Sequence, residues 1–569
     1  MRSTLLPILA AAGVLFAATA TATAAPDPAA RTEVPVVSTS PVTSVLETVV
    51  GLRIPLPESA GPRPAACDRL AYLRWRHADG PTGSADADAV LIAQPGVFEG
   101  AAAFDTLARN TVAAAARNGR HIEFWALDRR SNCLEDHTGR LAALTSRDPH
   151  RAVDYYFRGA AVDGRTFAGY VPDSALGWLG RVGLAQTVQD QFDLLAAELP
   201  DPVARSRKVL CGGHSLGGLI TGFFAEWDFA GVPGRDQCAG YFALDSAVGT
   251  SLSALSGLPD ALLAPAGLGY GPTQAGLASG ALPRALALPA VINPETMNLL
   301  GIVGLAAAVA PTAESDLARY IPPNANQDAT YRILLSRDVF TALTGTPSVR
   351  DFRVTNAAAL GAFLDANSQP VSILKTGIGF FAGGPVVDKD FPPDTAALSA
   401  VPGLRALAGM LGGDDPMAIT GQPHGPLYSW RDYNEISGSP IPLGRDGRPF
   451  TTAADEVTSV HDLARSLAEH PLDFTEWYFP LKLTLDIAQS GAPEIARYRL
   501  HPGPGGAPII NLLGGSGIVV AGGGYGAGET VIVPGYHHLD VITAAAAQNG
   551  GGPEPVSTNL ARFAARLIG

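Results

Sequence analysis

Between residues 89 and 244, short apolar runs alternate with segments in which apolar residues recur at helical spacing. The short runs end at turn-forming residues, which is typical of buried strands. The pattern predicts strands at 89–93, 121–127, 208–211 and 240–244, and helices at 104–116, 183–199 and 216–227. Strands and helices that alternate in this way predict a mostly parallel sheet with helices on both faces.

The alternation fails after residue 250 and returns near the C-terminus. Residues 250–504 are rich in Ala, Leu, Gly and Pro and are mostly helical in pattern, whereas strands are expected again at 508–513 and 530–533, and a helix at 556–567. We therefore expect one sheet domain, formed by 66–249 and 505–569, with a cap inserted at 250–504. A stretch of this length is too long for a structureless loop. Its aromatic residues either line an apolar pocket or form the core of the cap: Phe380, Phe381, Phe474, Trp477, Tyr478 and Phe479.

The N-terminus has the features of an export signal. Arg2 precedes an apolar stretch that runs to Ala20, and Ala22-Thr23-Ala24 forms a small-x-small cleavage site. We expect residues 1–24 to be removed and the protein to be secreted or periplasmic. A membrane anchor is the alternative, but the stretch is short for a span. No later segment has about 18 consecutive apolar residues, so the mature chain is expected to contain no transmembrane segment.

The segment 25–65 is rich in Pro, Ala, Ser and Thr and is expected to form a loose leader over the surface. The net charge of −13 gives no basic footprint for nucleic acid. An acidic chain is compatible with a neutral ester or acyl substrate, although charge alone does not select one. The oligomeric state is not determined by these features.

Four cysteines, Cys67, Cys133, Cys211 and Cys238, allow three disulfide pairings in an exported protein. Their spacing fits no zinc pattern. Cys211 closes one predicted strand and Cys238 opens the next, which would place them at opposite ends of parallel neighbours. The sequence therefore favours Cys67–Cys133 and argues against Cys211–Cys238.

Gly213-His214-Ser215-Leu216-Gly217 matches the pattern G-x-S-x-G. In a chain with 64 glycines the pattern alone is weak evidence, but here it follows a predicted strand and leads directly into a helix, which is the setting that gives it meaning. Ser215 is the candidate nucleophile, and a serine needs a base to take its proton.

The candidate base, His538, lies in Tyr536-His537-His538-Leu539-Asp540, after the last predicted strand. This segment resembles the His-Leu-Asp signature of lipases in the α/β-hydrolase superfamily, which place the histidine near the C-terminus. The resemblance covers about 70–250 and 505–569 and implies an α/β-hydrolase fold with a large, mainly helical cap. It also implies catalysis through an acyl-enzyme, with no metal or organic cofactor.

Acyl transfer also needs donors for the oxyanion. One expected donor is the backbone N–H of Leu216, directly after the nucleophile. The other is expected in the turn Gln94-Pro95-Gly96-Val97-Phe98, which resembles a variant of the family's His-Gly turn. There we predict the N–H of Val97, with Phe98 as the next candidate. The alternative is an ordinary Pro-Gly turn.

The triad acid is less directly indicated. Many relatives carry it after the penultimate strand, but Gly517 stands at that place. Asp245 ends the strand that follows the nucleophile helix, and its context resembles the acid site of pancreatic-type lipases. We therefore predict Asp245 as the acid, with Glu529 as the alternative, and interpret Asp540 as a local helix cap.

These residues predict a secreted serine hydrolase that cleaves a small-molecule or lipid-like carboxylic ester. A peptidase or amidase with the same triad is one alternative, because nothing local separates ester from amide hydrolysis. A non-catalytic binding protein on the same fold is the other, because the common acid position is a glycine.

Overall fold

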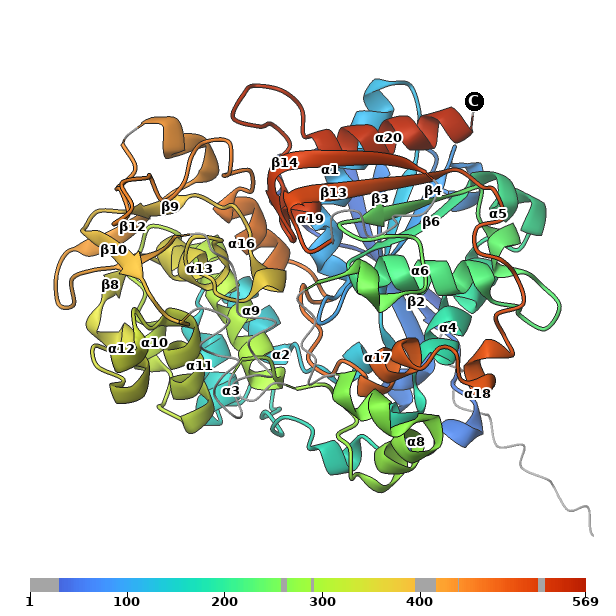
Figure 1. The fold of residues 1–569 in the computed structure, drawn as a ribbon, viewed down its shortest axis with the longest axis horizontal. Coiled ribbons are helices and arrows are strands. Elements are labelled where there is room, and N and C mark those ends of the chain that lie inside the picture. The colour runs from blue at the N-terminus through green and yellow to red at the C-terminus, as the bar shows by residue number, and fades with distance from the viewer. Residues whose placement is uncertain are drawn as a thin grey trace, which may run out of the picture.

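The computed structural model describes residues 30–256, 263–287, 291–393, 416–438, 440–519 and 528–568. The predicted export signal at 1–24 lies outside these ranges. Figure 1 shows the main sheet with helices packed against it and, beside the sheet, a region made of helices and small sheets.

The described residues form a nine-stranded sheet in the order β1-β2-β3-β5-β4-β6-β7-β13-β14. From β5 to β14 all neighbouring strands are parallel, and β3 joins β5 in antiparallel orientation. The strand bounds are β1 Arg31–Pro35, β2 Val45–Arg53, β3 Arg69–His77, β4 Val90–Gln94, β5 Glu123–Asp128, β6 Val209–His214, β7 Gly240–Leu244, β13 Ile509–Ser516 and β14 Glu529–His537. The mostly parallel sheet expected from the alternating pattern is confirmed.

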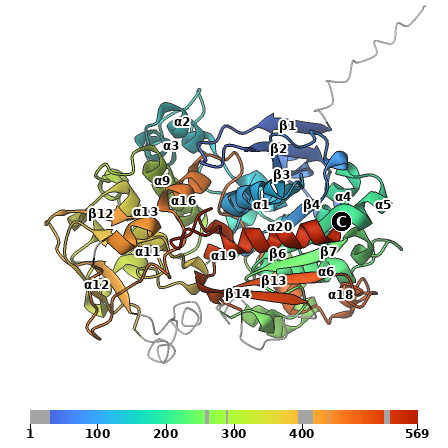
Figure 2. The same ribbon diagram turned by 90° about the horizontal axis from the view of Figure 1, so that it is seen from above.

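Helices cover both faces of this sheet. Helices α1 (Asp105–Arg117) and α20 (Pro555–Leu567) lie side by side on one face, and α4 (Leu184–Glu198) and α6 (Leu216–Glu226) lie together on the other (Figures 1 and 2). The short α5 (Pro202–Lys208) leads into β6, and α19 (Asp540–Thr543) follows β14. The central strands are therefore buried on both sides, which explains why their sequences are continuous apolar runs.

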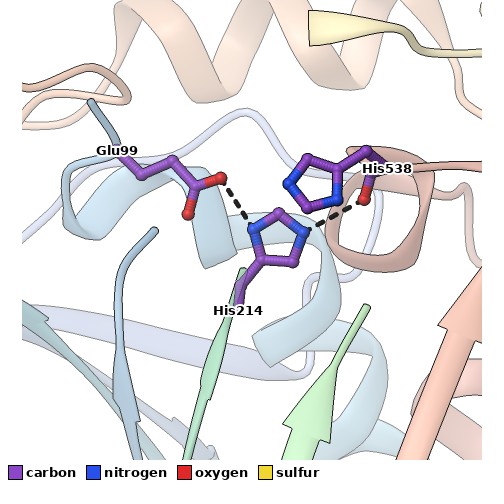
Figure 3. Close-up of side chains that lie close together, drawn as sticks. All are labelled: Glu99, His214 and His538. Carbon is purple, nitrogen blue, oxygen red and sulfur yellow. Dashed lines mark hydrogen bonds and ion pairs between the residues drawn. The ribbon is translucent and has the colours of Figure 1, made fainter. Parts of the chain in front are cut away.

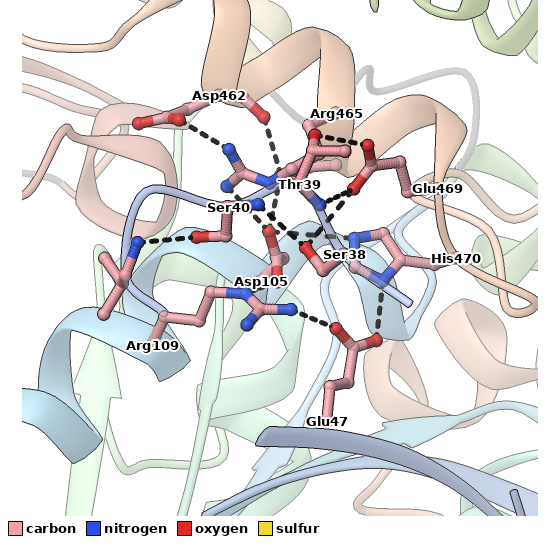
Figure 4. Close-up of polar contacts among 12 residues, drawn as sticks. Ser38, Thr39, Ser40, Glu47, Asp105, Arg109, Asp462, Arg465, Glu469 and His470 are labelled. Atoms are coloured by element: carbon pink, nitrogen blue, oxygen red, sulfur yellow. Dashed lines mark hydrogen bonds and ion pairs between the residues drawn. The ribbon is translucent and has the colours of Figure 1, made fainter. Parts of the chain in front are cut away.

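The expectation of a loose leader at 25–65 is wrong for the part that the structure describes. Strands β1 and β2 pair with each other, and β2 pairs with β3 along its whole length. Figure 4 shows why the segment between them is also fixed: Ser38 and Thr39 bond the carboxylate of Glu469, with Thr39 N donating at 2.9 Å. The Pro- and Ser-rich composition indicated a loop, whereas partners far along the chain hold the segment in place.

A buried ionic network lies behind this segment (Figure 4). Glu47 on β2 pairs with Arg109 on α1 and accepts a hydrogen bond from His470 Nδ1 at 2.7 Å. Burial lowers the pKa of His470, but the carboxylates of Glu47 and Asp105 outweigh it and raise that pKa to about 10. The network therefore joins β2 and α1 to residues 465–470 through paired charges.

Between β7 and β13 the chain forms more than the helical cap that was expected. Small strands also occur there, in one two-stranded and one three-stranded sheet within the described residues. The helices are α8 Tyr270–Ser279, α9 Pro294–Val309, α10 Leu317–Tyr320, α11 Ala325–Leu335, α12 Val339–Thr344, α13 Asn356–Leu364, α16 Val460–Ala468, α17 Leu481–Ala488 and α18 Pro493–Ala496. The strands are β8 Arg353–Val354, β9 Phe380–Ala382, β10 Val386–Lys389, β11 Met417–Thr420 and β12 Leu427–Arg431. Two further helices, α2 Thr138–Ser146 and α3 His150–Arg158, precede α4.

Much of this region shares its core with the sheet. Residues of α9, α13, α16 and α17 belong to the same buried apolar cluster as the central strands, whereas the small sheets have a cluster of their own around Phe380, Phe381 and Tyr428. The aromatic side chains named above are buried in these two clusters. Helix α9 is apolar and largely buried, and none of the helices in the described part of the chain is both long and apolar enough to span a membrane.

Both cysteine pairs form disulfides. Cys67–Cys133 is confirmed, but the argument against Cys211–Cys238 was wrong, since the Cα atoms of that pair lie 5.8 Å apart. Strand β6 continues to His214 instead of closing at Cys211, and Leu210 pairs with Gly240. Cys211 therefore lies beside the beginning of β7, within reach of Cys238.

Candidate active site

Ser215 occupies the turn between β6 and α6, with φ 54° and ψ −124°. A positive φ is strained for a residue with a side chain, and this strain is typical of a nucleophile held on a strand-to-helix turn. The turn is held by its neighbours: Ser215 N donates to Leu244 O at 3.1 Å, and Ser246 Oγ donates to Ser215 O. A Cβ on Gly217 would lie 2.0 Å from Gln94 O, so only glycine fits there.

His538 lies after β14 and is paired with Asp245. Its Nδ1–H donates to Asp245 Oδ2 at 2.6 Å, and both side chains are buried. Because Nδ1 carries the proton, Nε2 of the neutral ring is unprotonated, as a general base requires. In the described structure His538 makes no hydrogen bond to Ser215 Oγ; such bonds are often long without substrate.

The carboxylate of Asp245 points across to the end of β13. It accepts hydrogen bonds from Gly514 N at 3.1 Å and from Ile518 N at 2.9 Å, in addition to His538. A Cβ on Gly517 would lie 2.2 Å from Asp245 Oδ1. The Asp245 carboxylate therefore fills the space that a side chain at 517 would need, which explains the glycine at that position.

The structure does not bring Glu529 to the site. Glu529 is the first residue of the nine-residue strand β14 and pairs with Arg566. At about 3.3 Å per residue, it lies roughly 26 Å from His537 at the other end of the strand. Asp540 is close to the site but accepts hydrogen bonds from His537 N, Gly377 N and Thr458 Oγ1, so it fixes the histidine loop to the segment after α13.

The turn after β4 packs directly on Ser215. A Cβ on Gly96 would lie 2.8 Å from Ser215 Cβ. Gly96 N–H is already bonded to Glu99 Oε2 at 2.6 Å, whereas Val97 N–H donates no hydrogen bond within the described residues. Leu216 N–H begins helix α6 and so has no acceptor inside the helix. The two donors predicted for an oxyanion, Leu216 and Val97, therefore lie on adjoining turns beside Ser215.

A buried pair that the sequence did not indicate, Glu99 and His214, connects these turns (Figure 3). His214 Nδ1–H donates to Glu99 Oε1 at 2.6 Å, and His214 Nε2–H donates to the carbonyl of His538 at 3.0 Å. With both nitrogens donating, the ring is an imidazolium. Burial opposes this charge, but the Glu99 carboxylate outweighs burial and raises the pKa of His214.

The charged His214 ring also acts on the base. The two imidazole centroids are 4.3 Å apart. Burial and the positive charge of His214 together lower the pKa of His538, and they outweigh the opposing effect of its hydrogen bond to Asp245. His538 therefore stays neutral to a lower pH than an ordinary histidine.

Arg129 holds the turn after β4 through the backbone carbonyls of that turn. Its guanidinium donates to Pro95 O at 2.9 Å and to Gly96 O, and it pairs with Glu476 at 2.7 Å. Glu476 N in turn donates to Phe98 O at 2.8 Å. A polar network around 128–132 thus holds the predicted oxyanion turn. It includes Glu476, which lies near the C-terminal end of the predicted cap.

Among the residues that the structure describes, three groups of acidic and histidine side chains have ligand atoms close enough to hold a metal: Glu99, His214 and His538; Glu47, Asp105 and His470; Glu135, His137 and Asp473. In the first, His214 uses both nitrogens as donors to protein oxygens, so it offers no lone pair to a metal. In the second, Glu47 and Asp105 are paired with arginines, and in the third, Asp473 is paired with Arg140. These contacts fit protein cross-links better than metal sites.

The sheet order, the serine on the turn between β6 and α6, and the histidine after the last strand define an α/β-hydrolase fold. Solved structures similar to this chain include an open-form lipase (12% identity, 88% of this chain and 96% of that one, TM-score 0.27). A monoglyceride lipase variant from Saccharomyces cerevisiae (10%, 88% and 91%, TM-score 0.28) and a juvenile hormone epoxide hydrolase from the silkworm Bombyx mori (11%, 92% and 78%, TM-score 0.31) are also similar. No protein-family model and no curated protein sequence matches the chain.

Replacing Gly517 by alanine should lower kcat strongly, because the new Cβ would displace the Asp245 carboxylate that it overlaps. Hydrolysis of p-nitrophenyl butyrate measures the effect. Gly249→Ala is the matched control, since a Cβ there meets nothing within 4 Å. Equal kcat in the two variants would contradict the placement of Asp245.

Replacing His214 by glutamine should move the acid limb of the kcat/KM profile to higher pH. As the predicted base, His538 would work only when neutral, so activity would be lost as the pH falls through its pKa, and removing the adjacent positive charge raises that pKa. The double variant Glu99→Gln/His214→Gln avoids leaving Glu99 unpaired, and exposed His424→Gln is the control. An acid limb that stays in place in both His214 variants would show that His214 does not act on His538.

Proposed function

We propose that this protein is a secreted carboxylic-ester hydrolase in which Ser215, His538 and Asp245 act as a catalytic triad. The observation that carries the proposal is the 2.6 Å hydrogen bond between His538 and Asp245, beside a serine held at positive φ. The fold supports the coarser statement that the chain is a hydrolase of the α/β type.

In the proposed reaction, His538 Nε2 takes the proton of Ser215 Oγ as that oxygen attacks the acyl carbon. The tetrahedral intermediate collapses, and the alkoxide leaves with the proton from His538. Water then attacks the acyl-enzyme with His538 again as the base, and the carboxylic acid is released. Asp245 orients the imidazole and stabilises its positive form.

Leu216 and Val97 are the proposed oxyanion donors. Their backbone N–H groups are preorganised because Gly96 and Phe98, on either side of Val97, are tied to Glu99, Arg129 and Glu476. Donors fixed before the reaction cost no reorganisation when charge develops on the substrate oxygen. The dipole of helix α6, which begins at Leu216, adds to the same effect.

Glu99 accounts for a further part of the site. Its two oxygens accept from different donors: Oε2 accepts from Gly96 N–H, and Oε1 accepts from His214 Nδ1–H. Gly96 is thereby removed as an oxyanion donor. The mechanism therefore assigns Glu99 and His214 to positioning and not to proton transfer with the substrate.

Ester hydrolysis is preferred to amide hydrolysis on the resemblance to lipases, and a peptidase or amidase remains the second candidate. The same serine, histidine and donors perform both reactions. Paired substrates with one acyl group, as an ester and as an amide, decide between them. Faster turnover of the amide would replace the ester proposal.

Export is proposed from the export signal at 1–24. It fits the two disulfides, which persist in oxidising compartments. The structure places β1 at Arg31–Pro35. Cleavage near Ala25 would leave this strand intact, and the N-terminal residue of the exported chain identifies the cleavage site.

We expect a fluorophosphonate to label Ser215 in the folded protein and Ser215→Ala to abolish the labelling. Asp245→Asn should lower kcat by orders of magnitude, up to about 10⁴-fold, because the histidine would lose its orienting carboxylate. Glu529→Gln is the matched control at the other end of β14 and should leave kcat unchanged. Absence of an adduct would overturn the enzyme proposal, and normal turnover by Asp245→Asn would remove that residue from the triad.

A further inference from the structure

A cavity of about 420 Å³ lies among the helices and small sheets between β7 and β13. Its volume is within the range of roughly 300–1,000 Å³ that is usual for small-molecule sites. The walls are mainly aliphatic and aromatic side chains from α9, α11, α13, β9 and β11: Leu299, Val303, Tyr331, Phe363, Phe381 and Ile419. A cavity of this kind favours an apolar ligand over water.

This cavity is distinct from the site around Ser215. None of its lining residues belongs to the turns that carry Ser215, Val97, Asp245 or His538. Its wall helices α11, α12 and α13 lie beside the main sheet, whereas Ser215 lies at the beginning of α6 in the sheet region (Figure 1). A ligand held here would not occupy the catalytic turn.

The mouth of the cavity is apolar and open to solvent. Phe340 lines it and is 70% exposed, and Leu343, one turn further along the short helix α12, is 75% exposed. Large apolar side chains exposed this fully beside an apolar hollow are typical of a ligand entrance. They offer a surface for an aliphatic chain on its way into the cavity.

One cation at the mouth is uncommitted. Arg337 lines the cavity, and its guanidinium makes no hydrogen bond or ion pair in the part of the chain that the structure describes; its charge acts only at longer range on the adjacent Asp338 carboxylate. The other charged groups there have partners: Arg319 pairs with Glu314 at 3.2 Å, and Asp338 caps α12 by accepting from Thr341 N at 2.8 Å. Arg337 therefore has its full set of donors free for a carboxylate.

We propose that this cavity is a second binding site, for a fatty acid whose aliphatic chain fills the apolar walls and whose carboxylate binds Arg337. The volume of about 420 Å³ has room for an aliphatic chain, and a single guanidinium without a hydrogen-bond partner matches a single carboxylate head. The site does not depend on catalysis at Ser215.

The test is calorimetric titration of Ser215→Ala protein with laurate, so that loss of catalysis and loss of cavity binding are separate results. We expect one laurate per chain. Ala362→Trp, which fills the cavity from α13, should weaken binding roughly tenfold or more; exposed Ala275→Trp on α8 should not. If Ala362→Trp fails to fold, Ala359→Leu is the smaller filling of the same wall.

The head group is tested with Arg337→Gln, with Arg207→Gln as the exposed control. Arg337→Gln should weaken laurate binding several-fold and leave dodecanol binding unchanged, because only the carboxylate needs the guanidinium. Laurate binding that is insensitive to Ala362→Trp and its smaller counterpart would overturn the proposal. Equal weakening of laurate and dodecanol would overturn the role of Arg337, and dimerisation abolished by Ala362→Trp would assign the hollow to a second copy of the chain.

Discussion

The buried pair of Glu99 and His214 is the contact on which the geometry of the site depends. Glu99 bonds the turn after β4, His214 belongs to the turn that carries Ser215, and the second nitrogen of His214 bonds the backbone of His538. Three segments that are far apart in sequence are thereby joined by two side chains. Removing one partner of such a pair costs about 3–5 kcal/mol, because the other is left as an uncompensated buried charge.

The same pair also affects the pKa of His538. An imidazolium next to the base lowers the pKa of His538, and a carboxylate on its far side keeps that imidazolium charged inside the protein. Asp245 and the His214 charge therefore act on His538 in opposite directions. The first fixes the tautomer of the ring, and the second favours its neutral form.

Much of the sheet was predictable because its central strands are buried on both faces and are read as continuous apolar runs. The strand at 240–244 and the helix beginning at Leu216 were placed at their observed positions. Ser215 was a candidate because its G-x-S-x-G pattern follows such a strand, and His538 because it lies in a His-Leu-Asp segment after the last predicted strand. Their catalytic roles stay predictions, as does the role of Asp245, although the structure brings Asp245 to His538.

The remaining features depend on contacts between distant segments, which local patterns do not contain. Strand β2 was missed because its partner β3 and the Glu47–Arg109 pair identify it, whereas its surroundings resemble a loop. Glu99 gave no signal, since its partner His214 becomes a neighbour only when β4 and β6 pair. The position of Arg129 likewise depends on a distant partner, because Glu476 lies in the predicted cap.

The position of Asp245, directly after β7, limits which parts of the chain can vary in length. Ser215 and Asp245 lie on either side of one helix, in a single unbroken β6–α6–β7 unit. The intervening region between β7 and β13 can thus gain or lose surface segments without changing the spacing between nucleophile and acid. Of the three residues, only His538 follows the intervening region in sequence, in the loop after β14. Evolutionary growth at the surface of this region is in this way uncoupled from the site, except where Glu476 pairs with Arg129 and where Gly377 and Thr458 bond Asp540 beside the histidine loop.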